Sequence, residues 1–122
     1  MTTTVHDFIT HIRAGKPVSF EQTMSMIDEH YQFAPTVFEN GLGDHVVVNQ
    51  AGENNGSCKI IAFARLHNLN QQQTLELFGD YYRINVLNDP EGTSHMNIRA
   101  FMKHGWDGIT MRENPLQPRS QP

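Results

Sequence analysis

The sequence of 122 residues contains a single cysteine and no long apolar run. One cysteine excludes an internal disulfide and any cysteine-rich zinc site. The longest apolar run covers residues 60–64, whereas a helix that crosses a bilayer needs about 20 apolar residues. The first residues also lack the basic region and apolar core of a secretory signal peptide. We therefore expect a soluble protein with no membrane span.

Charged residues are scarce as well, and the basic residues do not outnumber the acidic ones. Charged residues make up 18% of the chain and the formal net charge is −4. A protein that binds the phosphate backbone of nucleic acids normally carries a basic patch, so we expect no general nucleic-acid binding. The chain is rich in amides instead, with ten Asn and eight Gln. Several of them precede expected helices, where amides cap helices or form turns.

Apolar residues spaced three and four apart, with polar caps before them, predict about five helices in one compact domain. The expected caps are Thr3 or Thr4, Ser19, Ser57, Asn70, and Thr93 or Ser94. Gln22 and Gln73 each follow a cap by three residues, which predicts two capping boxes. The third helix is apolar on most sides, so we expect it to be buried at the centre. The fourth is expected to run on towards Asp89.

Little of the sequence favours strands. The β-branched run at residues 46–48 predicts one short strand, and residues 109–111 are a candidate partner. We therefore expect a mainly α fold with at most a small two-stranded β element. From residue 113 onwards prolines alternate with polar residues. Proline lacks the amide proton that helices and sheets use, so we expect a single domain over 1–112 and a flexible tail over 113–122.

Five motifs stand in order along the chain. They are Phe-Ala-Pro-Thr-x-Phe-x-Asn-Gly at 33–41, Asn-x-Gly-Ser-Cys-Lys at 54–59, Leu-Phe-Gly-x-Tyr-Tyr at 77–82, Pro-x-Gly-Thr-x-His-x-Asn-Ile-Arg-x-Phe-Met at 90–102 and His-Gly-Trp at 104–106. Together they resemble the HopJ type III effector family from about residue 5 to 108. The resemblance implies a family named after a plant-pathogen effector, with no established biochemical activity.

Membership of such a family implies delivery into a host cell by type III secretion. The N-terminus does not favour this, because Val5 already begins a helix face and leaves little unstructured leader. We therefore expect the protein to be cytoplasmic in the cell that makes it.

Cys58 is the most suggestive residue for catalysis. With Ser57 as the cap, it would lie in the first turn of a helix, where the helix dipole lowers the pKa of a thiol. His95 is the candidate base, and Asn54 or Asn97 could orient it or donate to an oxyanion. This arrangement would suit a thiol-dependent hydrolase or transferase. The alternative is that Cys58 packs in the core, as free cysteines usually do.

A small anionic ligand is a second candidate. Residues 54–57 precede a helix, where backbone amides can hold phosphate or carboxylate. The candidate ligand contacts are Asn55, Gly56, Ser57, Lys59 and Arg99. The alternative is an ordinary helix entry with a tight Asn-Gly turn.

Metal binding has weaker support in the sequence. The seven histidines form no His-x-x-x-His or His-Glu-x-x-His motif. A metal site would have to assemble over long range from the cluster of Cys58 and His95, so no metal ligand is assigned. The sequence leaves open both whether the chain binds a cofactor and whether it is an enzyme. We expect it to act by binding a protein partner or a small anionic ligand.

Overall fold

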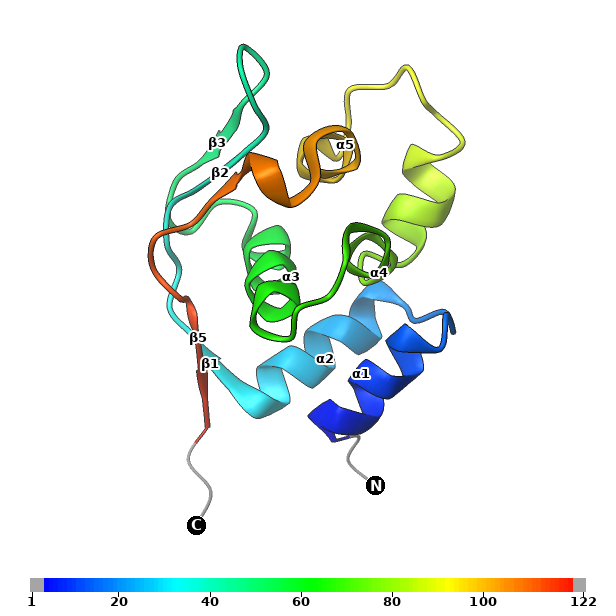
Figure 1. The fold of residues 1–122 in the computed structure, drawn as a ribbon, viewed down its shortest axis with the longest axis vertical. Helices are drawn as coiled ribbons and strands as arrows, with labels where there is room; N and C mark the ends of the chain where they lie inside the picture. Colours follow the sequence, from blue (N-terminus) through cyan, green and yellow to red (C-terminus); the bar gives the residue numbers. More distant parts are fainter. Residues whose placement is uncertain (1–3, 120–122) are drawn as a thin grey trace.

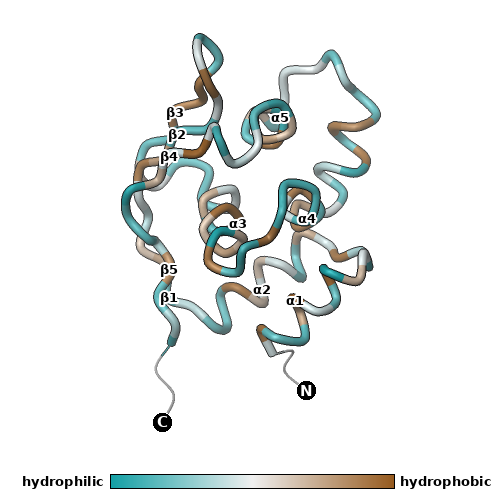
Figure 2. The backbone as a smooth tube through the Cα atoms, in the orientation of Figure 1, coloured by the Kyte–Doolittle hydropathy of each residue, from teal (hydrophilic) through white to brown (hydrophobic). Residues whose placement is uncertain are grey.

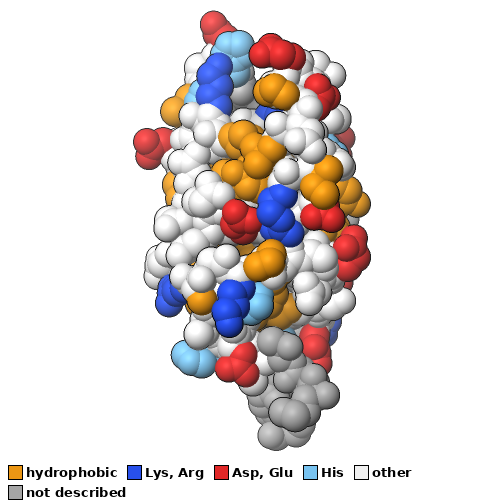
Figure 3. Space-filling view, turned by 90° about the vertical axis from the view of Figure 1, so that its right-hand side faces the viewer, with side chains coloured by type: hydrophobic (Ala, Val, Ile, Leu, Met, Phe, Trp, Pro, Cys, Tyr) orange, Lys and Arg blue, Asp and Glu red, His pale blue; other side chains and the backbone are white. Residues whose placement is uncertain are grey.

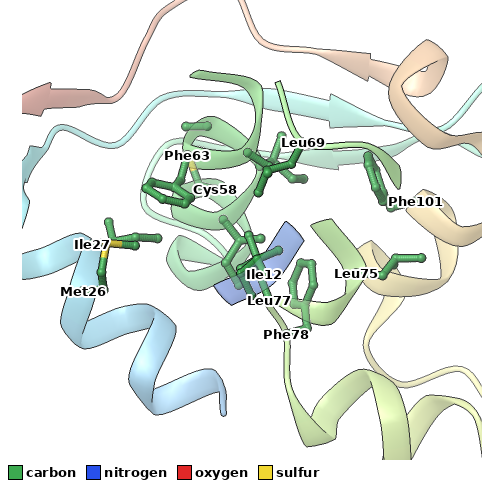
Figure 4. Packing of buried hydrophobic residues seen from close by; sticks show 14 of the residues in the cluster. Ile12, Met26, Ile27, Cys58, Phe63, Leu69, Leu75, Leu77, Phe78 and Phe101 are labelled. Carbon is green, nitrogen blue, oxygen red and sulfur yellow. The ribbon is translucent and has the colours of Figure 1, made fainter. Parts of the chain in front are cut away.

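The structure is a computed structural model in which residues 4–119 are described. Helix α3 (Asn55–Leu66) lies at the centre of the fold, as its apolar sequence predicted (Figure 1). Ile60, Ile61 and Phe63 of this helix have no exposed surface. Figure 4 shows the side chains of α3 packed among apolar residues of the neighbouring helices, and Figure 2 shows hydrophobic stretches gathered around α3.

Four other α-helices in the described part of the chain pack around α3. They are α1 (Val5–Arg13), α2 (Phe20–His30), α4 (Gln71–Glu76) and α5 (Met96–His104), with a 3-10 turn η2 (Gly105–Gly108) after α5. The capping boxes at Ser19 and Asn70 are both confirmed, and the Thr4 hydroxyl caps α1. Thr3, the alternative cap, lies outside the described residues. Nowhere in residues 4–119 is a helix long and apolar enough to cross a membrane.

The single long helix predicted after Asn70 is wrong. Helix α4 stops at Glu76, and a π-helix, η1 (Tyr81–Val86), follows it. Gly79 lies between the two with φ +63°, and a Cβ at this position would come within 2.5 Å of the backbone nitrogen of Phe20. The chain therefore turns at a glycine that lets η1 approach the start of α2. Figure 1 shows η1 as the unlabelled yellow-green helix beside α4.

The β structure is larger than the sequence predicted. Five short strands among the described residues form two antiparallel sheets, with strand orders β1-β5 and β3-β2-β4. They are β1 (Tyr31–Phe33), β2 (Phe38–Asn40), β3 (Val47–Asn49), β4 (Ile109–Thr110) and β5 (Leu116–Pro118). The expected strand at 46–48 exists as β3, but β4 does not pair with it, because β2 lies between them. Strands of two or three residues carry too little alternation for a sequence pattern to detect.

The segment predicted as a flexible tail contains β5. Leu116 of this strand is fully buried and pairs with Phe33 of β1. The Arg119 backbone N–H donates to the His30 carbonyl at 3.0 Å. The prediction failed for residues 116–118 because Pro118 ends a two-stranded sheet, and an edge position does not require its amide proton. Residues 120–122 of the expected tail lie outside the described residues.

Candidate functional site

A cavity of about 550 Å³ lies between the starts of α3 and α5. Five of the nine residues that the sequence singled out line it: Asn54, Gly56, Ser57, His95 and Asn97. The sequence did not single out the remaining lining residues, which are Phe20, Val47, Phe78, Tyr81, Met96 and Ile98. The structure thus brings together two motifs that lie far apart in the sequence.

Helix α3 begins at the cavity without a side-chain cap. Its N-cap is Asn54 rather than the predicted Ser57, and Asn54 has left-handed backbone angles of φ 51° and ψ 50°. The Asn54 side chain donates instead to Oδ1 of Asn49, at 2.7 Å. By contrast, the side chains of Thr4, Ser19 and Asn70 cap α1, α2 and α4. The first amide groups of a helix have no partner within it, so those of α3 are left without a side-chain acceptor.

Helix α5 begins in the same way. Its N-cap is His95, with φ 53° and ψ 52° and no side-chain capping bond, whereas the sequence predicted Thr93 or Ser94. Left-handed backbone is costly for residues other than glycine, and such residues cluster at functional sites. Two helices therefore start at one cavity, each through a left-handed residue, and their positive dipole ends favour negative charge there.

Buried asparagines hold these two helix starts in place. Asn49 and Asn97 are 0% and 6% exposed and bond through both amide groups: Nδ2 of each donates to Oδ1 of the other, at 3.0 and 2.9 Å. Asn40 donates to the backbone oxygen of Asn97 at 2.8 Å. With Asn54, this network joins β2, β3, α3 and α5. The side-chain amide of Asn54 thus donates within this network.

Aromatic rings form one wall of the cavity. The Tyr81 ring lies 5.0 Å from the Phe20 ring and 5.1 Å from the His95 ring, measured between centroids. A Cβ at Gly56 would come within 2.8 Å of Cζ of Phe20, so glycine is needed for the ring to lie against α3. Tyr81 is 38% exposed and Met96 is 49% exposed. Only the motif at 77–82 pointed to Tyr81, and it assigned no role to the ring.

Cys58 does not line the cavity, although it belongs to the same helix turn. Its side chain is 1% exposed and lies in the apolar core (Figure 4). Burial raises the pKa of the thiol, an effect opposed in part by a hydrogen bond from the Thr36 backbone and by the charge of Arg65. The thiol hypothesis needed a lowered pKa and a nearby His95, so this geometry favours the packing alternative.

The remaining candidates have structural partners. Nζ of Lys59 pairs with Oδ1 of Asp28 at 2.8 Å and lies over the Phe33 ring. The guanidinium of Arg99 donates to the backbone oxygens of Ser94 and Asp89, at 2.5 and 2.8 Å, and so holds the loop before α5. Asn55 lies outside the cavity lining. Across residues 4–119, no three His, Cys, Asp or Glu side chains lie close enough together to hold a metal ion.

Similarity to known proteins extends over almost all of the chain. The family model described as HopJ type III effector protein matches residues 5–116. A solved structure, the crystal structure of the unknown-function protein VPA0580, matches with a TM-score of 0.90 and 41% sequence identity. This match covers 98% of the present chain and 97% of the other. No curated protein matches the chain.

Proposed function

The chain belongs to the HopJ type III effector family, and from this premise we propose that it binds a small molecule in the cavity between α3 and α5. The ligand carries an anionic group, which meets the starts of the two helices, and an apolar part, which packs against Tyr81. The cavity itself is the observation that carries the proposal. Its volume of about 550 Å³ falls within the range of about 300–1,000 Å³ that is typical of ligand pockets.

The helix starts support the anionic group. Backbone amides in the first turn of a helix are natural donors to phosphate or carboxylate. Asn54 and His95 both leave these amides without a side-chain cap. The hydroxyl of Ser57 lines the same cavity and is a further donor.

Apolar side chains of the cavity lining support the apolar part. Phe20, Tyr81 and Met96 line the cavity together, and aromatic rings and methionine are common contacts for flat apolar groups. The π-helix that carries Tyr81 agrees with this role, because π-helices occur frequently at functional sites.

A titration followed by amide NMR tests this proposal. The probes are phenyl phosphate, benzoate and inorganic phosphate, added separately to the full chain. We expect phenyl phosphate or benzoate to shift the amide signals of residues 55–57 and 96–98 in a saturable way, and to do so at lower concentration than inorganic phosphate. No shift with any probe, or shifts spread over the surface, would contradict the proposal.

Ser57→Asp provides a variant that keeps the fold. Aspartate in the first turn of α3 is favourable to the helix dipole, so we expect stability to be maintained. The same carboxylate repels an anion in the cavity, and binding of phenyl phosphate should weaken by about tenfold or more, as for other misplaced like charges. Ser25→Asp, on the exposed face of α2, is the matched control. Equal affinities in the two variants would count against an anion subsite.

The two alternative functions receive less support. A thiol-dependent enzyme lacks an accessible thiol at the cavity, since Cys58 is buried. A metal-binding protein lacks a cluster of ligands within the described residues. The cytoplasmic location expected from the sequence stays a prediction.

A further inference from the structure

Asn97 is the most deeply buried polar residue in the lining of the cavity. It is 6% exposed, and it belongs to the first turn of α5, beyond the left-handed cap His95. The other polar residues of the lining are each more open to solvent: Asn54, Ser57, Tyr81 and His95. A ligand that touches the Asn97 side chain must therefore have entered the cavity and not only its mouth.

The hydrogen-bond network fixes the orientation of the Asn97 amide. Nδ2 of Asn40 lies 2.8 Å from the backbone oxygen of Asn97, and a carbonyl oxygen only accepts, so Asn40 donates here. The same nitrogen lies 3.1 Å from the side chain of Asn97, and the atom that it meets there is the acceptor Oδ1. The other arm of the Asn97 amide is therefore Nδ2, which donates to Oδ1 of Asn49 at 2.9 Å.

One N–H of the Asn97 side chain has no partner within residues 4–119. Its Nδ2 carries two hydrogens, and Asn49 accepts one of them. Its Oδ1 is fully used, since it accepts from both Asn40 and Asn49. Because Asn49 and Asn97 bond through both amide groups, the hydrogen in use lies on the Oδ1 side of the amide, and the free hydrogen points away from the pair. The side chain thus offers the cavity a donor and no acceptor.

Backbone donors lie beside this free N–H. The amides of Met96, Asn97 and Ile98 form the first turn of α5, and none of them has an acceptor in the described part of the chain. An anion with two or more oxygens can therefore meet Nδ2 of Asn97 through one oxygen and these amides through another. Hydrogen bonds to an ionised acceptor are stronger than those between neutral groups, which favours an oxyanion over a neutral carbonyl or hydroxyl group.

We propose that Asn97 is the residue that selects the ligand, and that the ligand is an aromatic oxyanion, a flat ring that carries a carboxylate or a phosphate. The inference rests on the ligand binding proposed above and adds the atom that recognises the anionic group. One oxygen of that group accepts the free N–H of Asn97, and the ring lies against Tyr81. An aromatic ammonium compound has only donors to offer and is rejected by the same N–H.

Burial is what makes Asn97 selective. Once a ligand fills the cavity, water no longer reaches the free N–H, so a ligand without a matching acceptor leaves it unpaired. An unpaired buried donor costs free energy, and sites of this kind reject analogues that lack the matching group. Ser57 and His95 do not impose this requirement, because a hydroxyl or a neutral imidazole can both donate and accept.

Amide NMR of the Asn97 side chain tests the inference. Figure 3 views the side of the molecule that carries η1 and shows several separate apolar groups, so an aromatic probe has other surfaces to contact. The buried Nδ2 group responds to entry into the cavity, and its two protons give separate signals. We expect benzoate or phenyl phosphate, added to the full chain, to shift the signal of the free proton in a saturable way. The proton bonded to Asn49 should move far less.

Benzylamine is the matched control probe. It has the same ring with a cation in place of the oxyanion, and it should shift neither proton. Of the two oxyanions, the one that binds more tightly identifies whether the site prefers a carboxylate or a phosphate.

Two variants separate recognition of the ligand from support of the fold. Asn97→Ser removes the free N–H. Asn40→Ser is the matched control, because Asn40 is fully buried in the same network, does not line the cavity and leaves the pair of Asn49 and Asn97 intact. We expect Asn97→Ser to weaken binding of phenyl phosphate by about tenfold more than Asn40→Ser does, the size of a hydrogen bond to a charged group. Equal weakening would mean that both residues act through the fold alone and would overturn the inference.

The outcomes separate this inference from the ligand binding on which it rests. Binding that shifts the backbone amides of residues 55–57 and 96–98 but not the free Nδ2 proton overturns the inference and leaves the ligand binding in place. Equal binding of benzylamine and benzoate also overturns it. If neither oxyanion binds, the proposed function fails and the inference fails with it. The NMR measurement on the unmodified chain gives these answers even if Asn97→Ser does not fold.

Discussion

Asn97 illustrates how single side chains shape the cavity. Its amide exchanges two hydrogen bonds with Asn49 and accepts a third from Asn40 at 3.1 Å. A buried amide is stabilising only when its partners are in place, because each group left unpaired costs free energy. The Asn97 side chain thus ties α5 to both β2 and β3.

Asn97→Ala should destabilise the protein strongly. The change removes the three side-chain hydrogen bonds that Asn97 makes with Asn40 and Asn49, each worth about 0.5–1.5 kcal/mol. We expect the free energy of unfolding in urea to fall by about 2–4 kcal/mol on that basis. Asn88→Ala, at an exposed asparagine, is the control and should change the free energy by less than about 0.5 kcal/mol. Similar losses in the two variants would show that the network contributes little.

At the scale of elements, η1 owes its place to Gly79. The residue combines a left-handed φ of +63° with close contact to the backbone at the start of α2. Either requirement alone favours glycine. Together they fix where α4 ends and bring Tyr81 against Phe20, which builds the aromatic wall of the cavity.

Gly79→Ala should be more damaging than the same change at Gly15. Both positions have positive φ, +63° and +78°, but a Cβ at Gly15 would meet no atom within 4 Å. Gly15→Ala thus reports the backbone strain alone, at about 1 kcal/mol. Gly79→Ala adds a steric clash, and we expect a total loss of about 3 kcal/mol or more by thermal or urea unfolding. Equal losses would argue that α2 yields easily at this contact.

Sequence patterns predicted the elements whose signals are local. The caps at Thr4, Ser19 and Asn70 lie within three residues of the amides they bind, so the starts of these three helices were predicted correctly. The sheets were underestimated because β2 pairs with strands that follow it by several or by many residues, up to Thr110. Such pairing is not visible in a short sequence window.

The candidate site was predicted only in part for the same reason. Asn54, His95 and Asn97 were singled out, and they do lie together at the cavity. Cys58 was singled out for a position near the helix start, but its orientation depends on tertiary packing. Tyr81 was missed because only the turn at Gly79 brings its ring to the cavity.

At the scale of the whole molecule, a partly buried polar pair links stability to pH. The Tyr31 hydroxyl and Nε2 of His67 share a hydrogen bond of 2.8 Å, and burial raises the pKa of Tyr31. Burial and the charge of Arg13 lower the pKa of His67. The folded chain therefore favours neutral His67.

The protein should lose stability as the pH falls below the ordinary histidine pKa. His67 binds a proton more readily in the unfolded chain than in the folded one. Its stabilising contribution is thus complete above about pH 6.5, the value for an unperturbed histidine, and is lost as the pH falls through the lower folded value. Urea unfolding between pH 7.5 and about 5 measures this slope.

His67→Gln is the variant that tests the assignment. It should give a flatter pH dependence over that interval, while His6→Gln, at an exposed histidine, should keep the original slope. A His67→Gln curve parallel to that of the unmodified protein would assign the pH dependence to other groups.

The pairing of β1 with β5 has a consequence for biosynthesis. Residues 31–33 leave the ribosome well before Leu116, which completes their sheet and the adjoining core. Until then the nascent chain presents an open strand edge and an unfilled apolar site, features that promote aggregation. Ribosome stalling or premature termination before residue 116 would therefore leave a chain that depends on chaperones to avoid aggregation.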